Sequence, residues 1–147
     1  MSVERAYDLA ERMRQLGAED PEEWAESELT EDIAQEARWL VIRRVREAVT
    51  WTNDNVRNLP EVAQLLDAGT DARLVLGAMR EVAREAAFAV LDVIDEGADP
   101  DAPEDAPGWV VMETRFGDDG EVTFSGRDVG GLHESLGFPN SDGIYQS

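Results

Sequence analysis

Six apolar residues between positions 75 and 93 alternate in spacing between four and three residues. They are Val75, Met79, Val82, Ala86, Ala89 and Val93. This spacing places all of them on one stripe of an α-helix, and Thr70 and Gly97 suit the two ends of such a helix. The sequence therefore predicts a long helix over about residues 71–96. Its apolar stripe has to be covered, either by another segment of the chain or by a second copy.

A second helix with a broad apolar surface is predicted from Ile33 to about Trp51, with Thr30 as its N-terminal cap. Apolar residues cover more than half of its circumference, which is typical of a central helix contacted on several sides. Trp39 falls on its polar side, where it is either exposed or covered by another element. Arg44 falls among apolar positions and is expected to have a carboxylate partner or to reach water. We expect this helix to form a hairpin with the helix over 71–96 and to cover its stripe.

The remaining elements are shorter. Helices are predicted over residues 3–16, after Pro21 and over 61–67, strands over 109–116 and 121–124, and a short helix over 132–136. Both faces of the strand pair are partly apolar, so we expect the β-hairpin to lie against the helices. The predicted fold is α+β and mostly helical, with a long central helical hairpin, in a single domain over residues 1–147. It comprises a helical region over residues 1–97, an acidic proline-rich linker over 98–107, and a β-hairpin with its tail over 108–147.

The charge of the chain restricts its partners. Thirteen arginines, no lysine and 33 acidic residues give a formal net charge of -20. A protein that binds duplex nucleic acid or an anionic membrane needs a basic surface, so we expect neither partner. The arginines that gather between residues 38 and 57 are expected to pair with carboxylates of the flanking segments. The absence of cysteine, of a basic leader and of a long apolar run predicts a soluble cytoplasmic protein.

No motif for catalysis stands out. His133 is the only histidine and has no recognisable nucleophile motif near it. Two carboxylate pairs, Glu28 with Glu31 and Asp92 with Asp95, have the i, i+3 spacing with which helical hydrolases hold magnesium. Such pairs also arise by chance in so acidic a chain. We predict no catalytic residue, no cofactor, no metal site and no enzymatic activity. A hydrolase that depends on a divalent metal is the least favoured alternative.

The favoured hypothesis is a non-enzymatic acidic binding module that docks on a basic protein, as immunity proteins, antitoxins and nuclease inhibitors do. An aromatic side chain surrounded by carboxylates is the candidate partner-binding site. It consists of Glu22, Glu23, Trp24, Glu26 and Glu28. The alternative is a structural or accessory homo-oligomer, such as a homodimer, that associates through the stripe from Val75 to Val93.

Overall fold

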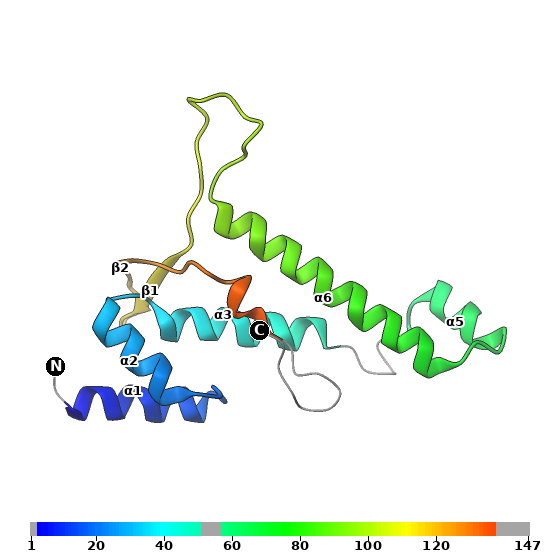
Figure 1. Ribbon diagram of the computed structural model, residues 1–147, viewed down its shortest axis with the longest axis horizontal. Coiled ribbons are helices and arrows are strands. Elements are labelled where there is room, and N and C mark those ends of the chain that lie inside the picture. Colours follow the sequence, from blue (N-terminus) through cyan, green and yellow to red (C-terminus); the bar gives the residue numbers. More distant parts are fainter. Residues whose placement is uncertain (1–2, 51–56, 138–147) are drawn as a thin grey trace.

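The computed structural model describes residues 3–50 and 57–137. The helices and strands follow one another as α1 (Val3–Gln15), α2 (Pro21–Glu31), α3 (Gln35–Val49), α5 (Pro60–Asp67), α6 (Ala72–Glu96), β1 (Met112–Phe116), β2 (Val122–Asp128) and the 3-10 helix η1 (Glu134–Leu136). The mostly helical α+β fold predicted from the sequence is confirmed (Figure 1). None of the helices in the described ranges is long and apolar enough to cross a membrane.

The hydrophobic core lies among α1, α2, α3, η1 and the C-terminal half of α6. Its most deeply buried large side chains are Met13, Ile42 and Leu132. Trp39 is also buried. The sequence left open whether it is exposed or covered by another element, and the structure shows that it is covered. Its indole N–H donates to the carbonyl of Leu16 at 3.2 Å, and its ring meets Trp24 edge to face at 5.7 Å between centroids.

The junction between α2 and α3 corrects one prediction. Asp20 and Pro21 begin α2 as predicted, but Thr30 does not cap the next helix. Thr30 lies inside α2, where its hydroxyl donates to the carbonyl of Glu26 at 2.7 Å. The helix continues to Glu31 and ends at Asp32, which adopts a left-handed conformation with φ of 56° that short polar side chains tolerate better than most.

The long helix α6 runs over almost the predicted residues. Asp71, and not the predicted Thr70, caps it by accepting the backbone N–H of Arg73 at 2.8 Å, and Gly97 ends it with φ of 72°. Its C-terminal half crosses above α3 and contacts the core through Ala87, Leu91 and Ile94 (Figure 1).

The predicted apolar stripe of α6 does not face α3 or the hydrophobic core. Val82 and Val93 are 68% and 53% exposed, whereas Leu91 is 3% exposed. At about 100° per residue, Leu91 lies about 200° around the helix from Val93. The prediction that α3 covers the stripe is therefore wrong, because the larger side chains Leu91 and Ile94 on the other side fill the core.

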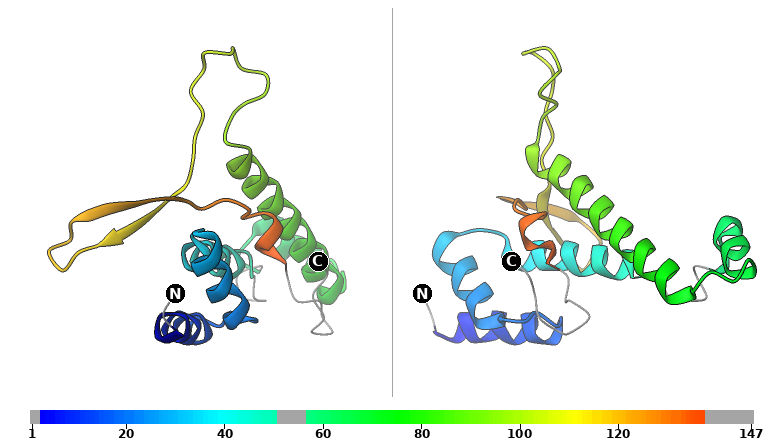
Figure 2. Two further views of the ribbon diagram at one scale, coloured as in Figure 1. Left: turned by 60° about the vertical axis from the view of Figure 1, so that its left-hand side comes forward. Right: turned by 45° about the vertical axis from the view of Figure 1, so that its right-hand side comes forward.

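Strands β1 and β2 pair antiparallel, with Thr114 opposite Phe124. The second strand continues to Asp128, four residues further than predicted, and the ladder shifts register between Met112 and Thr114. The hairpin projects from the helices instead of lying against them (Figure 2), and Phe124 near its end is 72% exposed. The prediction that helices cover the hairpin is wrong for this outer portion, since only its base is held to the helical body.

The acidic, proline-rich segment predicted as a linker forms a loop between α6 and β1 that extends away from the helices (Figure 1). The loop closes at its base, where the Trp109 backbone N–H donates to the carbonyl of Gly97 at 2.7 Å. The Trp109 indole N–H donates to the carbonyl of Val93 at 3.1 Å. A Cβ atom on Gly108 would lie 2.5 Å from the oxygen of Gly97, so this close approach requires glycine.

Candidate functional site

The acidic residues proposed on α2 do not share one surface. Glu22, Glu23 and Glu26 are exposed, and Glu22 forms an ion pair with Arg14. Trp24 is half-buried because its ring packs against Trp39, so it does not stand out as an anchor. Glu28, the remaining member, is buried.

Glu28 belongs to an internal ion cluster that holds the β-hairpin to α2. The carboxylate of Glu28 accepts the backbone N–H of Glu36 at 2.7 Å and the guanidinium of Arg127 at 3.1 Å. Arg127 also donates to Glu113 at 2.8 Å, and the two glutamates are 5% and 7% exposed. These contacts occupy the Glu28 carboxylate inside the protein, so it is not available to a partner.

The ionisation of this cluster follows from its contacts. Burial of Glu113 favours its neutral form, but hydrogen bonding by Ser125 and Arg127 outweighs burial and leaves the pKa of Glu113 below its usual value. Burial likewise disfavours the charged form of Arg127, but its bonds to Glu113 and Glu28 raise its pKa. Glu113 and Arg127 therefore remain charged at neutral pH and hold each other.

A small hollow of about 290 Å³ opens beside Trp24. Asp20 and Glu23 line it on the α2 side, and Gln35 and Arg38 line it on α3. Within the described residues, Gln35 Oε1 and Arg38 Nε are buried and have no hydrogen-bond partner. The hollow thus keeps two residues of the predicted site. The exposed carboxylates of Asp20 and Glu23 suit a cationic side chain, although the guanidinium of Arg38 also lines the hollow.

A larger accessible surface lies on α6. Its apolar residues point away from the core and form what we call the α6 face. They are Val75, Met79, Val82, Ala86, Ala89, Val90 and Val93. Some members are only partly exposed, whereas Val82, Val90 and Val93 are exposed. Glu85, Asp92 and Glu96 follow one edge of this face on the helical projection.

The lone histidine joins η1 to α6. His133 Nδ1 lies 2.8 Å from Asp95 Oδ2, a carboxylate oxygen that also accepts the His133 backbone N–H at 2.9 Å. The ring of Phe88 meets the imidazole edge to face at 5.4 Å. The hydrogen bond to Asp95 is the main reason that the pKa of His133 is raised, and the charges of Asp95, Asp92 and Glu134 add to it.

The two carboxylate pairs considered as magnesium ligands have other contacts. Glu28 binds Arg127, and Asp95 binds His133. Over residues 3–50 and 57–137, no three histidine, aspartate or glutamate side chains gather in a way that could hold a metal ion.

Two contributors to these sites were not predicted. Arg127 lies in a glycine-rich segment that resembles a flexible connector, and the hollow depends on Gln35, which no motif distinguishes. The one signal in the sequence that could have indicated the ion cluster was Arg127 itself. It is a single cation between strand-like residues and glycines, and a cation that becomes buried at such a position needs a partner.

Comparison with protein-family models, with curated proteins and with solved structures finds no match to this chain.

Proposed function

We propose that the protein is a non-enzymatic binding module for a basic protein, and that the α6 face is the docking surface. The observation that carries this proposal is the exposure of a continuous apolar helix face, with Val82, Val90 and Val93 each more than half exposed. A soluble protein seldom leaves so long an apolar stripe in water, and such stripes mark interaction sites.

The charge around the α6 face favours a basic partner over a second copy. Acidic side chains at Glu85, Asp92 and Glu96 would meet one another or apolar side chains in a symmetric pair. Each copy also carries a net charge of -20, so two copies repel one another at low salt. A partner helix with an apolar face and with lysines or arginines along its edge would match both the apolar residues of the α6 face and the carboxylates beside them.

The hollow beside Trp24 gives the same partner a second point of contact. The exposed carboxylates of Asp20 and Glu23 provide acceptors for one basic side chain. A protein that presents carboxylates in this way can block a cationic site, as an inhibitor of a basic nuclease or toxin does. Inhibition of such an enzyme is the role that we propose within this class.

The test uses two synthetic amphipathic helical peptides with the same leucine face, one with lysines along its edges and the other with glutamates. We expect the intact protein to bind the lysine peptide and not the glutamate peptide in fluorescence anisotropy. Val82→Asp with Val93→Asp should weaken binding at least about tenfold, because two carboxylates then interrupt the apolar contact. Both valines are exposed, so the double variant should retain its fold by circular dichroism.

Neutralising α2 provides the matched comparison. Glu22→Gln with Glu26→Gln removes two exposed charges without touching α6 or the hollow. This α2 variant should bind the lysine peptide within about threefold of the intact protein, since each exposed charge contributes little. Equal binding of the peptide by the intact protein and by the α6 double variant would refute α6 as the docking surface.

Self-association is the second candidate function, and the four-three spacing of the exposed α6 face favours it. Sedimentation of the intact protein at about 50 mM and about 500 mM salt distinguishes the two functions. A monomer at both salt concentrations supports the binding module. A dimer that persists at both, and that Val82→Asp with Val93→Asp abolishes, would establish the homo-oligomer in its place.

A further inference from the structure

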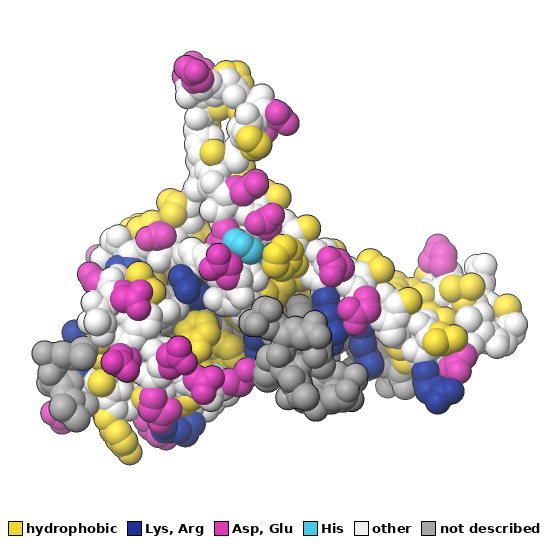
Figure 3. All heavy atoms as spheres, viewed as in Figure 1, with side chains coloured by type: hydrophobic (Ala, Val, Ile, Leu, Met, Phe, Trp, Pro, Cys, Tyr) yellow, Lys and Arg dark blue, Asp and Glu magenta, His cyan; other side chains and the backbone are white. Residues whose placement is uncertain are grey.

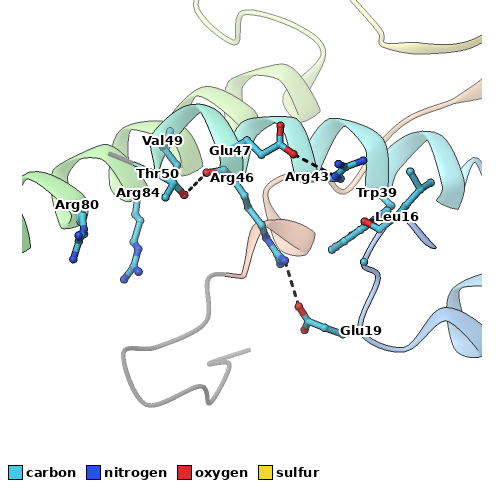
Figure 4. Close-up of a pocket in the computed structure, with 11 residues that line it drawn as sticks. Leu16, Glu19, Trp39, Arg43, Arg46, Glu47, Val49, Thr50, Arg80 and Arg84 are labelled. Carbon is cyan, nitrogen blue, oxygen red and sulfur yellow. Dashed lines mark hydrogen bonds and ion pairs between the residues drawn. The ribbon is translucent and has the colours of Figure 1, made fainter. Parts of the chain in front are cut away.

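A groove of about 700 Å³ lies between α3, α6 and the segment that joins α1 to α2 (Figure 4). Four arginines line it, with Arg43 and Arg46 on α3 and Arg80 and Arg84 on α6. Among the described residues that line it, the carboxylates are those of Glu19 and Glu47, which pair with Arg46 at 3.4 Å and with Arg43 at 3.3 Å. The balance of charge among these lining residues is therefore positive, although the chain as a whole carries -20.

The arginines on α6 are placed one helical turn apart. Figure 4 shows Arg80 and Arg84 extending from α6 in the same direction, and Arg46 extending from α3 toward Glu19. Arg84 also forms an ion pair with Glu81 on the same helix at 3.0 Å, so an anion in the groove would share this guanidinium with Glu81. In the described ranges of the chain no carboxylate pairs with Arg80, although acidic residues outnumber arginines 33 to 13.

The other side chains of the groove determine what can fit beside the arginines. Leu16 and Val49 give it an apolar wall, and Trp39 also lines it. The guanidinium of Arg46 lies over the Trp39 ring at 5.2 Å from the ring centroid. That face of the indole is thus occupied, and a nucleobase cannot stack on it.

We propose that this groove binds a small multivalent oxyanion, with phosphate or carboxylate groups held by Arg80, Arg84 and Arg43. The planar guanidinium group offers paired N–H donors that match both kinds of oxygen. The volume is that of a small-molecule site. An extended polyanion such as nucleic acid is disfavoured, because the chain as a whole carries a net charge of -20.

This inference does not depend on the proposed docking of a basic protein. The arginines of the groove project from the side of α6 that carries Leu91, away from the exposed valines of the α6 face. An anion in the groove and a basic partner on the α6 face can therefore be tested separately.

Isothermal titration calorimetry with inorganic pyrophosphate and with citrate tests the groove. We expect the intact protein to bind at least one of them, more weakly at about 300 mM than at about 50 mM salt. Arg80→Gln should weaken binding about tenfold, because one charge-assisted contact is lost, and Arg80→Gln with Arg84→Gln should abolish it. A preference for pyrophosphate assigns the groove to phosphates, and a preference for citrate assigns it to carboxylates.

Arg73→Gln is the matched control. Arg73 is an exposed arginine on the same helix outside the groove, so the variant has the same net charge as Arg80→Gln. It should bind the probe within about twofold of the intact protein. Unchanged circular dichroism of each variant excludes misfolding as the cause. The proposal fails if neither probe binds below about 10 mM, or if Arg73→Gln and Arg80→Gln weaken binding equally.

Discussion

Among individual residues, Arg127 makes the most consequential contacts in the described structure. Its guanidinium is 15% exposed and contacts two buried carboxylates that come from α2 and β1. Most other arginine pairs lie on the surface, as with Arg14 and Arg73, and such pairs contribute little. Together with Val111 and Val129, which pack in or against the hydrophobic core, Arg127 therefore attaches the β-hairpin to the helices.

Replacing this arginine should destabilise the protein strongly. Arg127→Met leaves Glu28 and Glu113 buried without a countercharge, and we expect a loss of about 3–5 kcal/mol in the free energy of unfolding. Urea denaturation measures the loss. Adding Glu28→Gln and Glu113→Gln should recover some of it, because the uncompensated charges are removed. Arg115→Gln is the control and should cost less than about 1 kcal/mol, since Arg115 is exposed. A loss of that small size for Arg127→Met would contradict the cluster.

The pKa of His133 gives a second prediction at this scale. Because contact with Asp95 raises it, protonation of His133 stabilises the fold fully below about pH 6.5, and this contribution disappears as the pH rises through the folded-state pKa. NMR titration of the single histidine should show the raised pKa in the intact protein. Asp95→Asn should lower it clearly, and Asp92→Asn should lower it less, because Asp92 is 3.8 Å away and half-exposed. An Asp95→Asn variant with the original pKa would exclude the proposed cause.

At the scale of the elements, α6 shows what periodicity can and cannot predict. Its extent was predicted closely, because Thr70 and Gly97 suggested the ends and the spacing between them is regular, although the cap is the neighbouring Asp71. The buried face was not predicted. Ala87, Leu91 and Ile94 form a second apolar row, and only the neighbouring helices decide which row they cover.

Two leucines of α6 test this assignment. Leu91→Ala should lower the free energy of unfolding by about 2–4 kcal/mol, because it opens a cavity at a side chain that is 3% exposed. Leu74→Ala makes the same chemical change where the side chain is 71% exposed, and should cost less than about 0.5 kcal/mol. Thermal or urea unfolding of both variants measures the two losses in the free energy of unfolding. Equal losses would mean that the core lies on another side of α6.

The β-hairpin shows a similar limit. Alternating residues and the turn around Gly117 and Gly120 predicted the strand pair, and the turn forms with the Gly117 N–H donating to the carbonyl of Glu121 at 2.8 Å. Its position was not predicted, because it depends on Glu113 and Arg127 meeting Glu28, which lies 99 residues before Arg127. A contact over that distance in the sequence leaves no local pattern.

For the whole molecule, net charge was the most informative sequence feature, but it did not locate a site. Space-filling shows acidic side chains over much of the visible face and arginines gathered below the middle of α6 (Figure 3). The predicted binding residues divided between the surface, the core edge and a buried ion cluster, because α2 packs with Glu28 inward. A high number of acidic residues in one stretch of sequence does not show which carboxylates are exposed and which are paired inside the protein.

The closed base of the loop between α6 and β1 has a practical consequence. Since Gly97 and Trp109 are hydrogen-bonded to each other, the chain leaves the body and returns to it at one point. A foreign sequence, such as an epitope or a circularly permuted reporter, could replace residues 100–106 without separating the ends that must meet. The protein thus offers a built-in attachment point for labels.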